Sequence, residues 1–277
     1  MHRLLALDVD GTLLDPTGQL RPAVRAALAR VRAAGVTVVL ATGRRLRSLQ
    51  PLLADLDFAG ALILNNGAVV LEVPGPRLLA RRPLPRALAR EAVEIIWTQG
   101  CQPLVYEGVP GEDRIFTGPS DRDSPLTARY LAVRGLAGLV RWPDSRWLLP
   151  GDPVEVGVLD TAEQIARLVA ALGQDRWRTI VSRTTLTPEG RFLELLERSC
   201  SKGAALADLC AVYGIDRSEV VAIGDNVNDL EMLEYAGLAV AMGNAPPEVQ
   251  AVADWVTASN AEDGVALAIY RLFAGRL

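Results

Sequence analysis

Apolar positions in the first 83 residues fall into two repeating patterns. One is a short, nearly continuous run of leucine and β-branched residues, which is typical of a strand buried on both faces. The other repeats every three or four residues, as Val24, Leu28 and Val31 do, and predicts a helix with one buried face. The predicted strands lie at 3–9, 36–43 and 61–67, the helices at 21–35 and 47–56, and a hairpin at 68–82.

The same two patterns return near residue 202 and continue to the end of the chain. Near-continuous apolar strands that alternate with helices predict a mostly parallel sheet covered on both faces. We therefore expect a doubly wound, Rossmann-like α/β core built from residues 1–83 and 190–277. The predicted helices of the second half lie at 202–214, 229–237, 247–253 and 265–273, and its strands at 219–225, 238–243 and 255–257.

Between these two parts the rhythm changes, because short strands and helices are separated by loops rich in Pro, Gly, Asp and Ser. This pattern predicts a separate α+β domain over residues 84–189, inserted into the core. Its predicted helices lie at 86–100, 125–135 and 161–173, and its strands at 102–108, 113–118, 153–160 and 176–186.

The composition narrows the possible chemistry. The formal net charge is −4 at pH 7, which argues against broad binding to nucleic acid or anionic lipid, and no apolar run approaches the length of a membrane span. His2 is the only histidine, which leaves almost no room for a histidine-based triad or a histidine-ligated zinc site. The cysteines (Cys101, Cys200 and Cys210) lack metal-site spacing and predict small buried side chains in a reducing compartment. We therefore expect a cytoplasmic protein without a nucleic-acid, membrane or obligate protein partner.

Two acidic residues follow the first predicted strand, in the sequence DVDGT. A strand that ends at Asp8 points Asp8 and Asp10 to the same side, because side chains alternate with a period of two. Open α/β sheets bind their ligands at the carboxyl ends of the strands. Two crowded carboxylates need a cation, and oxygen ligands without histidine or cysteine favour Mg²⁺. A solvated acidic turn is the alternative, whereas an EF-hand loop fails because Leu13 and Gln19 occupy its glycine and glutamate positions.

A second acidic group follows the strand at 219–225, in the sequence GDNVND. Asp225 lies at the tip of the strand, and Asp229 falls in the first turn of the next helix, where a carboxylate also suits the helix dipole. Asp229 fits a metal ligand and a helix-terminal charge equally well, and Asn228 is either a functional amide or a helix cap. Two acidic strand ends in one parallel sheet together favour a shared cation site.

Two further positions offer groups that bind phosphate. In ATGR, the Thr42 hydroxyl and the Gly43 amide stand at a strand-to-helix junction, where they can hold phosphate oxygens. A helix cap followed by a turn glycine is the alternative there. Lys202 is the only lysine among 29 basic residues. A site with several carboxylates and a phosphate needs the compact charge of an ammonium rather than a broad guanidinium, although an ordinary helix-start lysine is the alternative.

In this order, the sequences DVDGTL, ATGR, SKGAAL and GDNVND resemble the four motifs of the haloacid dehalogenase superfamily of phosphohydrolases. The domain inserted between the second and third motifs resembles that of the Cof-like, type IIB branch, in which an inserted α/β unit forms a cap. The sequence NNGA at 65–68 is also similar to that branch. The likeness covers the whole chain in motif order and spacing, without a departure at the motif residues.

The resemblance implies a role for each motif residue. Asp8 would be the nucleophile that forms an aspartyl-phosphate, and Asp10 would protonate the leaving alcohol and then activate water. Thr42 and Lys202 would bind the transferring phosphoryl group, and Lys202 would also restrain Asp8.

The resemblance also implies the metal ligands. Mg²⁺ would be held by Asp8, the main-chain carbonyl of Asp10 and Asp225, with Asp229 binding it directly or through water. Asn228 would help to bind phosphate or orient its neighbours.

Together these observations predict a Mg²⁺-dependent phosphatase for a small phosphorylated metabolite, such as a sugar phosphate or a phosphorylated cofactor. Arg44 and Asn66 are expected substrate contacts because they adjoin the motif loops. The alternative enzyme is a phosphomutase of the same fold, which would return the phosphoryl group to another hydroxyl. The non-enzymatic alternative is a phospho-aspartate signalling or metal-binding module, although receiver domains of that kind are much shorter.

Overall fold

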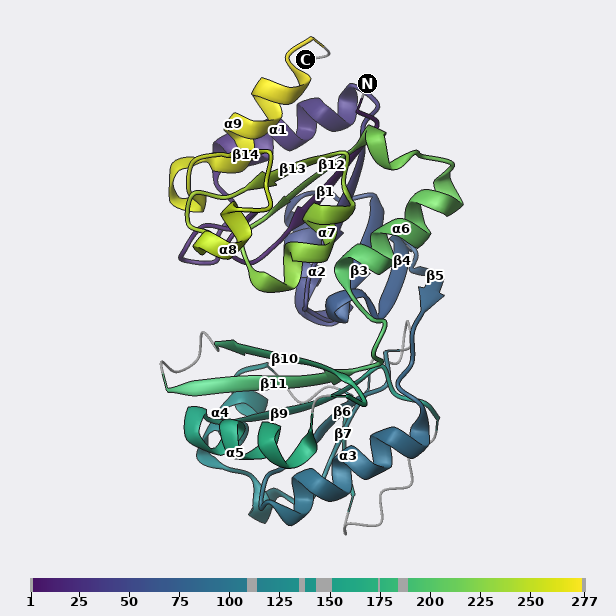
Figure 1. Cartoon of the computed structure of the whole chain (residues 1–277), viewed down its shortest axis with the longest axis vertical. Helices are drawn as coiled ribbons and strands as arrows, with labels where there is room; N and C mark the ends of the chain where they lie inside the picture. Colours follow the sequence, from purple (N-terminus) through teal and green to yellow (C-terminus); the bar gives the residue numbers. More distant parts are fainter. Residues whose placement is uncertain are drawn as a thin grey trace. The chain divides into compact units, whose positions relative to one another are not determined.

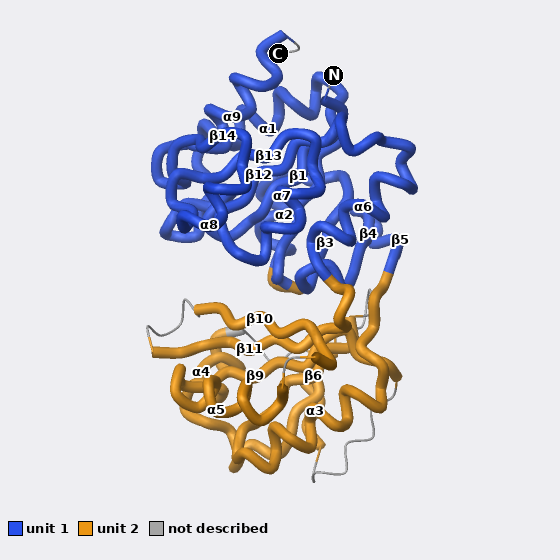
Figure 2. The backbone as a smooth tube through the Cα atoms, viewed as in Figure 1, with its two compact units in different colours: residues 1–44, 49–80, 201–277 blue, residues 45–48, 81–200 orange. Residues whose placement is uncertain are grey.

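The computed structural model describes residues 2–108, 114–134, 138–142, 151–173, 175–183 and 189–275. The chain forms two compact units, which Figure 2 shows in different colours. Residues 1–44, 49–80 and 201–277 form the core unit, and residues 45–48 and 81–200 form the insert unit. The predicted element ends at 113, 135 and 184–186 lie outside the described residues.

The core unit is built on an eight-stranded sheet with the strand order β14-β13-β12-β1-β2-β3-β4-β5 (Figure 1). Neighbouring strands from β14 to β3 pair in parallel, and β4 pairs with β3 in antiparallel. This arrangement confirms the predicted mostly parallel α/β sheet. Its strands are β1 (Leu4–Asp8), β2 (Thr37–Ala41), β3 (Gly60–Leu64), β4 (Val69–Val73), β5 (Arg77–Arg81), β12 (Val220–Gly224), β13 (Leu238–Ala241) and β14 (Trp255–Val256).

Helices cover both faces of this sheet (Figure 1). Helix α6 (Lys202–Tyr213) packs against α7 (Leu230–Tyr235) on one face, and α1 (Pro22–Ala33) packs against α9 (Gly264–Phe273) on the other. The buried side chains of α1 are those that the sequence pattern predicts, Val24, Ala27, Leu28 and Val31. The remaining helices are α2 (Leu46–Asp55) and α8 (Pro247–Gln250), which is shorter than predicted.

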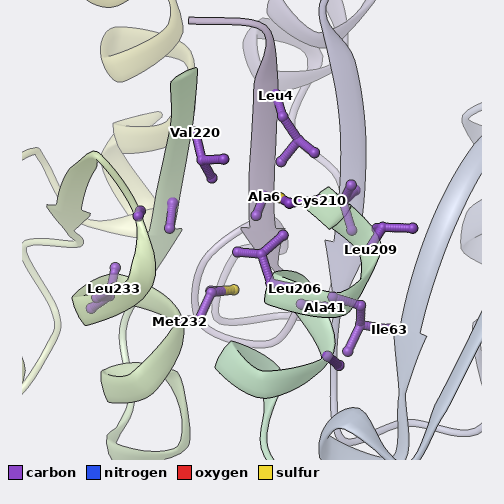
Figure 3. Packing of buried hydrophobic residues seen from close by; sticks show 14 of the residues in the cluster. Leu4, Ala6, Ala41, Ile63, Leu206, Leu209, Cys210, Val220, Met232 and Leu233 are labelled. Carbon is purple, nitrogen blue, oxygen red and sulfur yellow. The ribbon is translucent and has the colours of Figure 1, made fainter. Parts of the chain in front are cut away.

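Apolar side chains fill the space between the sheet and these helices. Leu4 and Ala6 of β1 belong to the same cluster as Leu206 and Met232, which come from α6 and α7 (Figure 3). Strand side chains alternate between the two faces, and Leu5 is also fully buried. Burial on both faces explains why these strands are continuous apolar runs in the sequence.

The insert unit contains a six-stranded sheet with the order β10-β11-β9-β6-β7-β8. Its strands pair in antiparallel except for β7 and β8, which pair in parallel. Apolar residues of this sheet pack against α3 and α5 in a second core. The elements are α3 (Arg86–Thr98), β6 (Leu104–Tyr106), β7 (Ile115–Thr117), α4 (Pro125–Arg134), β8 (Leu139–Arg141), β9 (Glu155–Thr161), α5 (Ala162–Leu172), β10 (Arg178–Arg183) and β11 (Gly190–Leu196).

The division of the chain differs from the expected insertion of residues 84–189. Strand β11 pairs with β9 and β10, so the segment that follows residue 189 belongs to the insert unit and not to the core. Leu193 and Leu195 are buried in the second core. No strand was predicted over residues 190–196, and a local sequence pattern does not specify which of two sheets a strand joins.

The three cysteine side chains lie inside the fold, as their spacing predicted. Cys101, Cys200 and Cys210 are buried, and burial raises the pKa of each thiol. Every helix in the described ranges is too short or too polar to cross a lipid bilayer.

The close contact between α6 and α7 depends on Gly203. A Cβ atom at this position would overlap the backbone carbonyl of Glu231 in α7. Alanine normally stabilises a helix relative to glycine, but here we expect Gly203→Ala to lower the free energy of unfolding by about 1–3 kcal/mol, because the two helices must separate. Chemical denaturation measures the change.

A matched control is Gly151→Ala, because no heavy atom lies within 4 Å of a Cβ placed there. This variant should keep wild-type stability. A Gly203→Ala variant as stable as the control would contradict the tight packing of α6 on α7.

Candidate active site

The predicted site residues meet at the carboxyl ends of three adjacent parallel strands. Asp8 is the last residue of β1, Thr42 follows β2 and Asp225 follows β12. The strand order β12-β1-β2 brings these three ends side by side at one edge of the core sheet. The sequence argument from strand ends is therefore confirmed for the positions of these residues.

Lys202 lies between two carboxylates. Its Nζ donates hydrogen bonds to Asp8 Oδ1 at 2.6 Å and to Asp229 Oδ1 at 2.7 Å, and its side chain is 1% exposed. Burial alone lowers the pKa of Lys202, but the charges of Asp229 and Asp8 outweigh this effect and hold that pKa above its ordinary value. Lys202 is therefore a permanently charged ammonium inside the fold.

A helix cap fixes the position of Lys202 at the start of α6. Ser201 caps α6, since its hydroxyl accepts a hydrogen bond from the Ala204 amide at 3.0 Å. Lys202 is the first residue of the helix, directly after the cap. The cap thus sets the position from which the lysine side chain reaches Asp8.

Three carboxylates gather around this single ammonium. One oxygen from each of Asp8, Asp225 and Asp229 lies within 4.8 Å of the others. Burial and the charge of Asp229 raise the pKa of Asp8 well above its ordinary value, and Lys202 offsets only part of this effect. Burial, again with the charge of Asp229, raises the pKa of Asp225 to about 6. The cluster has an excess of negative charge that a cation would neutralise.

The donors in this cluster suit a hard divalent cation. All three side chains offer carboxylate oxygens, which Mg²⁺ and Ca²⁺ prefer. Asp8 Oδ2 is buried and has no hydrogen-bond partner within the described part of the chain. A buried acceptor without a donor is unfavourable, so this oxygen is suited to a metal ion or a ligand. The residues present therefore fit a site for such a cation.

The oxygens of Asp229 are occupied by donors from the chain itself. Oδ1 accepts from Lys202, and Oδ2 accepts from the backbone amides of Asp225 and Asn226 at 3.1 and 3.0 Å. Gly224 permits this closure, because a Cβ atom there would lie 2.7 Å from the Asp229 Cβ. Asp229 thus takes the helix-terminal role that the sequence offered, since it completes the capping box of the short helix at Val227–Asp229, and it also lies within the acidic cluster.

Asp10 lies beyond the end of β1 and contacts an arginine of the second motif. Its carboxylate forms an ion pair with Arg44, whose Nε lies 2.7 Å from Asp10 Oδ2, and about half of the Asp10 side chain is exposed. Strand β1 ends at Asp8, and the chain then turns at Gly11 with φ of 89°. The period-two argument does not extend to Asp10, because the residue lies beyond the end of the strand.

The remaining predicted residues lie on neighbouring loops. The Thr42 hydroxyl accepts a hydrogen bond from the Arg44 amide at 3.0 Å and so closes this turn, but it does not cap the helix as the alternative interpretation expected, because α2 begins only at Leu46. The Asn66 amide packs over Gly43, and Asn66 Oδ1 accepts a hydrogen bond from Asn228 Nδ2 at 2.9 Å. The structure therefore joins the second and fourth motifs through a residue that belongs to neither.

Sequence reasoning missed one polar residue of this site. Asn244 Nδ2 donates to the Gly11 carbonyl at 2.9 Å and to Asp225 Oδ2 at 3.3 Å. The Thr12 hydroxyl donates to the other oxygen of Asp225 at 2.9 Å. Asn244 follows β13, another parallel strand, so the strand-end argument that found Asp225 also applies to it.

The chain is similar to known proteins over almost its whole length. The family model for haloacid dehalogenase-like hydrolases matches residues 5–269. The 5-amino-6-(5-phospho-D-ribitylamino)uracil phosphatase YwtE of Bacillus subtilis (strain 168) is 30% identical over 293 residues, covering 99% of each chain. An HMP-PP phosphatase of Serratia proteamaculans (strain 568) is 32% identical over 91% of this chain and 88% of its own length. The crystal structure of a haloacid dehalogenase-like hydrolase from Bacteroides thetaiotaomicron has a TM-score of 0.81 at 30% identity, covering 99% of this chain and 100% of that one.

The raised pKa of Asp225 predicts a pH-dependent stability of the metal-free protein. The unfolded carboxyl titrates near its ordinary pKa of 3.8 and the folded one near 6. The folded state therefore holds a proton that the unfolded state has lost, and this contribution, about 3 kcal/mol, disappears as the pH rises from about 4 to 7. Urea denaturation with EDTA measures it, and added Mg²⁺ should restore stability at pH 7.

Asp225→Asn removes this carboxyl together with its effect on the pKa of Asp8, whereas the lowered pKa values of groups such as Asp15 and Asp216, which have the opposite effect at lower pH, remain in both proteins. The difference in stability between wild type and variant should change with pH over this interval. A constant difference would contradict the raised pKa.

Proposed function

Because the chain belongs to the haloacid dehalogenase-like hydrolase family, as its four motifs indicated, we propose that it is a Mg²⁺-dependent phosphatase of a small phosphorylated metabolite. Two of the phosphatases to which it is similar are named for a phosphorylated ribitylaminouracil and for HMP-PP. Their names support a substrate of the same class, a sugar phosphate or a phosphorylated cofactor. We propose that the reaction passes through an aspartyl-phosphate.

One observation carries this proposal, the pairing of Asp8 with Lys202. The ammonium holds Asp8 Oδ1, while Oδ2 lacks a partner in the described residues. A carboxylate with one oxygen held and the other free is oriented for attack on an electrophile. The fixed ammonium beside it also neutralises the charge that a phosphoryl group brings, which is the main requirement of phosphoryl transfer.

In the first step, an Asp8 carboxylate oxygen forms a bond to phosphorus, and the bond from phosphorus to the ester oxygen breaks. Asp10 gives its proton to the leaving alkoxide, so that an alcohol departs. In the second step, Asp10 takes a proton from water, which attacks phosphorus and releases phosphate and free Asp8. For this role Asp10 must exchange its contact with Arg44 for the reacting oxygen.

Bound Mg²⁺ would supply positive charge at the phosphoryl oxygens. Asp8, Asp225 and the main-chain carbonyl of Asp10 would hold it. Because both oxygens of Asp229 already accept hydrogen bonds from the chain, we propose that Asp229 supports the metal through water and holds Lys202 in place. Thr42 and Gly43 would bind phosphoryl oxygens through the turn that follows β2.

The proposal is tested by measuring phosphate release from a panel of phosphorylated sugars and cofactors with Mg²⁺ or EDTA. Phosphate release should require Mg²⁺. Asp8→Asn should lower the rate of phosphate release by roughly a thousandfold or more, because the side-chain amide of asparagine is not a nucleophile. Asp121→Asn is a matched control on an exposed carboxyl of the insert unit and should retain activity. Isomerised substrate without free phosphate would favour a phosphomutase, and normal release by Asp8→Asn would refute the nucleophile.

Lys202→Arg tests the requirement for an ammonium. The site between Asp8 and Asp229 is closed to solvent, and a guanidinium is broader than the group it replaces. We expect turnover to fall by about a hundredfold or more and stability by about 1–3 kcal/mol. Steady-state kinetics below the melting transition measure the first effect and chemical denaturation the second.

Arg198→Lys is the matched control, because this side chain is exposed. It should change neither turnover nor stability. Wild-type turnover in Lys202→Arg would show that any positive charge suffices at this position.

A further inference from the structure

The segment between β14 and α9 contacts the loop that follows β1. Asn260 is 8% exposed, and its Nδ2 donates a hydrogen bond to the Leu14 carbonyl at 2.7 Å. The Leu14 amide in turn donates to the Val9 carbonyl at 3.0 Å, which closes the loop from Val9 to Leu14 around Asp10. A buried side chain that lies 246 positions along the chain therefore holds the loop that carries Asp10.

The same segment sets the orientation of the Asn244 amide. Asn244 Oδ1 accepts a hydrogen bond from the backbone amide of Asn260 at 2.9 Å. Asn244 Nδ2 donates to the Gly11 carbonyl at 2.9 Å and to Asp225 Oδ2 at 3.3 Å. An amide that was turned around would place its oxygen against those two oxygens. The contact with Asn260 and the contacts of Nδ2 therefore specify one orientation.

Internal contacts keep the segment Thr257–Gly264 compact. The Thr257 hydroxyl donates to the Gly264 carbonyl at 2.8 Å. The segment is also tied to the residue that precedes α1, because Arg21 donates to both carboxylate oxygens of Asp263, from Nε at 2.6 Å and from its terminal nitrogen at 3.1 Å. The segment thus contacts the chain after β1 at both Leu14 and Arg21.

We propose that Asn260 is a positioning residue for the cation site and that it acts through Asn244. Asn260 fixes the amide of Asn244, and this amide fixes the Asp225 carboxylate and the Gly11 carbonyl. The carbonyl of Asp10, which the proposed function assigns to the metal, directly precedes Gly11. The inference rests on the proposed function, because the cation is that of the phosphatase. Groups that orient a carboxylate ligand typically contribute tenfold or more to metal affinity.

A double-mutant cycle tests this relay. Asn244→Leu and Asn260→Leu each replace an amide with an apolar group of similar size. Tyr213→Phe is the matched control, because it removes one hydrogen bond of the core unit, from the Tyr213 hydroxyl to Glu72 Oε1 at 2.6 Å. Thermal melts of all variants identify any loss of folding. If Asn260→Leu does not fold, Asn260→Ala takes its place, because it leaves room for water at the Leu14 carbonyl.

Calorimetric titration with Mg²⁺ in the absence of substrate measures the effect. We expect Asn244→Leu to weaken Mg²⁺ binding by about tenfold or more, and the Asn260 variant by at least about threefold. The double variant should bind no more than about twofold more weakly than Asn244→Leu, because a residue that acts through another has little effect once its partner is gone. Tyr213→Phe should keep the wild-type affinity, since a loss of stability alone does not change the dissociation constant of the folded protein.

Two results would overturn the proposal. One is wild-type Mg²⁺ affinity in the Asn260 variant. The other is a double variant in which the two losses of affinity multiply in full, because Asn260 would then act independently of Asn244.

NMR spectra without metal separate this inference from the proposed function. The side-chain amide signals of Asn244 and the backbone amide signal of Asp225 should shift in the Asn260 variant and stay in place in Tyr213→Phe. Signals that do not respond would refute the relay even in an active phosphatase. A wild type that neither binds Mg²⁺ nor releases phosphate would refute the proposed function, whereas the same signals would still decide the relay.

Discussion

The burial of one ammonium between two carboxylates is the constraint on which the site depends. Lys202 Nζ contacts both Asp8 and Asp229, and none of the three side chains is more than 7% exposed. Removing one partner from a buried ion pair typically costs about 3–5 kcal/mol, because the other charge is left uncompensated. The three residues come from the end of β1, the start of α6 and the loop after β12. The packing of α6 on the sheet and the closure of that loop are therefore one coupled arrangement.

The charged centre is surrounded by neutral polar groups that orient it without adding charge. Thr12 and Asn244 hold the two oxygens of Asp225, and the backbone amides after β12 hold Asp229. Because each contact is a hydrogen bond from a neutral donor, the cluster keeps the excess of negative charge that a divalent cation requires. Arg44 is the exception, since its guanidinium is paired with Asp10 outside this cluster.

Glycine is required where backbones meet at this edge of the sheet. A Cβ atom on Gly224 would overlap Asp229, and one on Gly11 would overlap the carboxylate of Asp225. Gly11 also has a φ of 89°, which favours glycine on conformational grounds. These two positions let acidic side chains from different loops approach one another closely. The geometry of the site therefore depends on glycine residues as well as on charged side chains.

The amino-acid sequence by itself determined the alternation of strands and helices, the buried face of α1 and the strand ends that carry Asp8, Thr42 and Asp225. Periodicity is sufficient for this, because it records whether a side chain is buried, and parallel strands end at a common edge. Only the tertiary structure decided that Asp10 pairs with Arg44, that β11 joins the second sheet and that Asn244 holds Asp225. The partner of a side chain depends on contacts between distant segments, such as the 194 positions that separate Asp8 from Lys202. The local pattern of apolar and polar residues does not specify which distant residues meet. Those contacts are therefore known only from the folded structure.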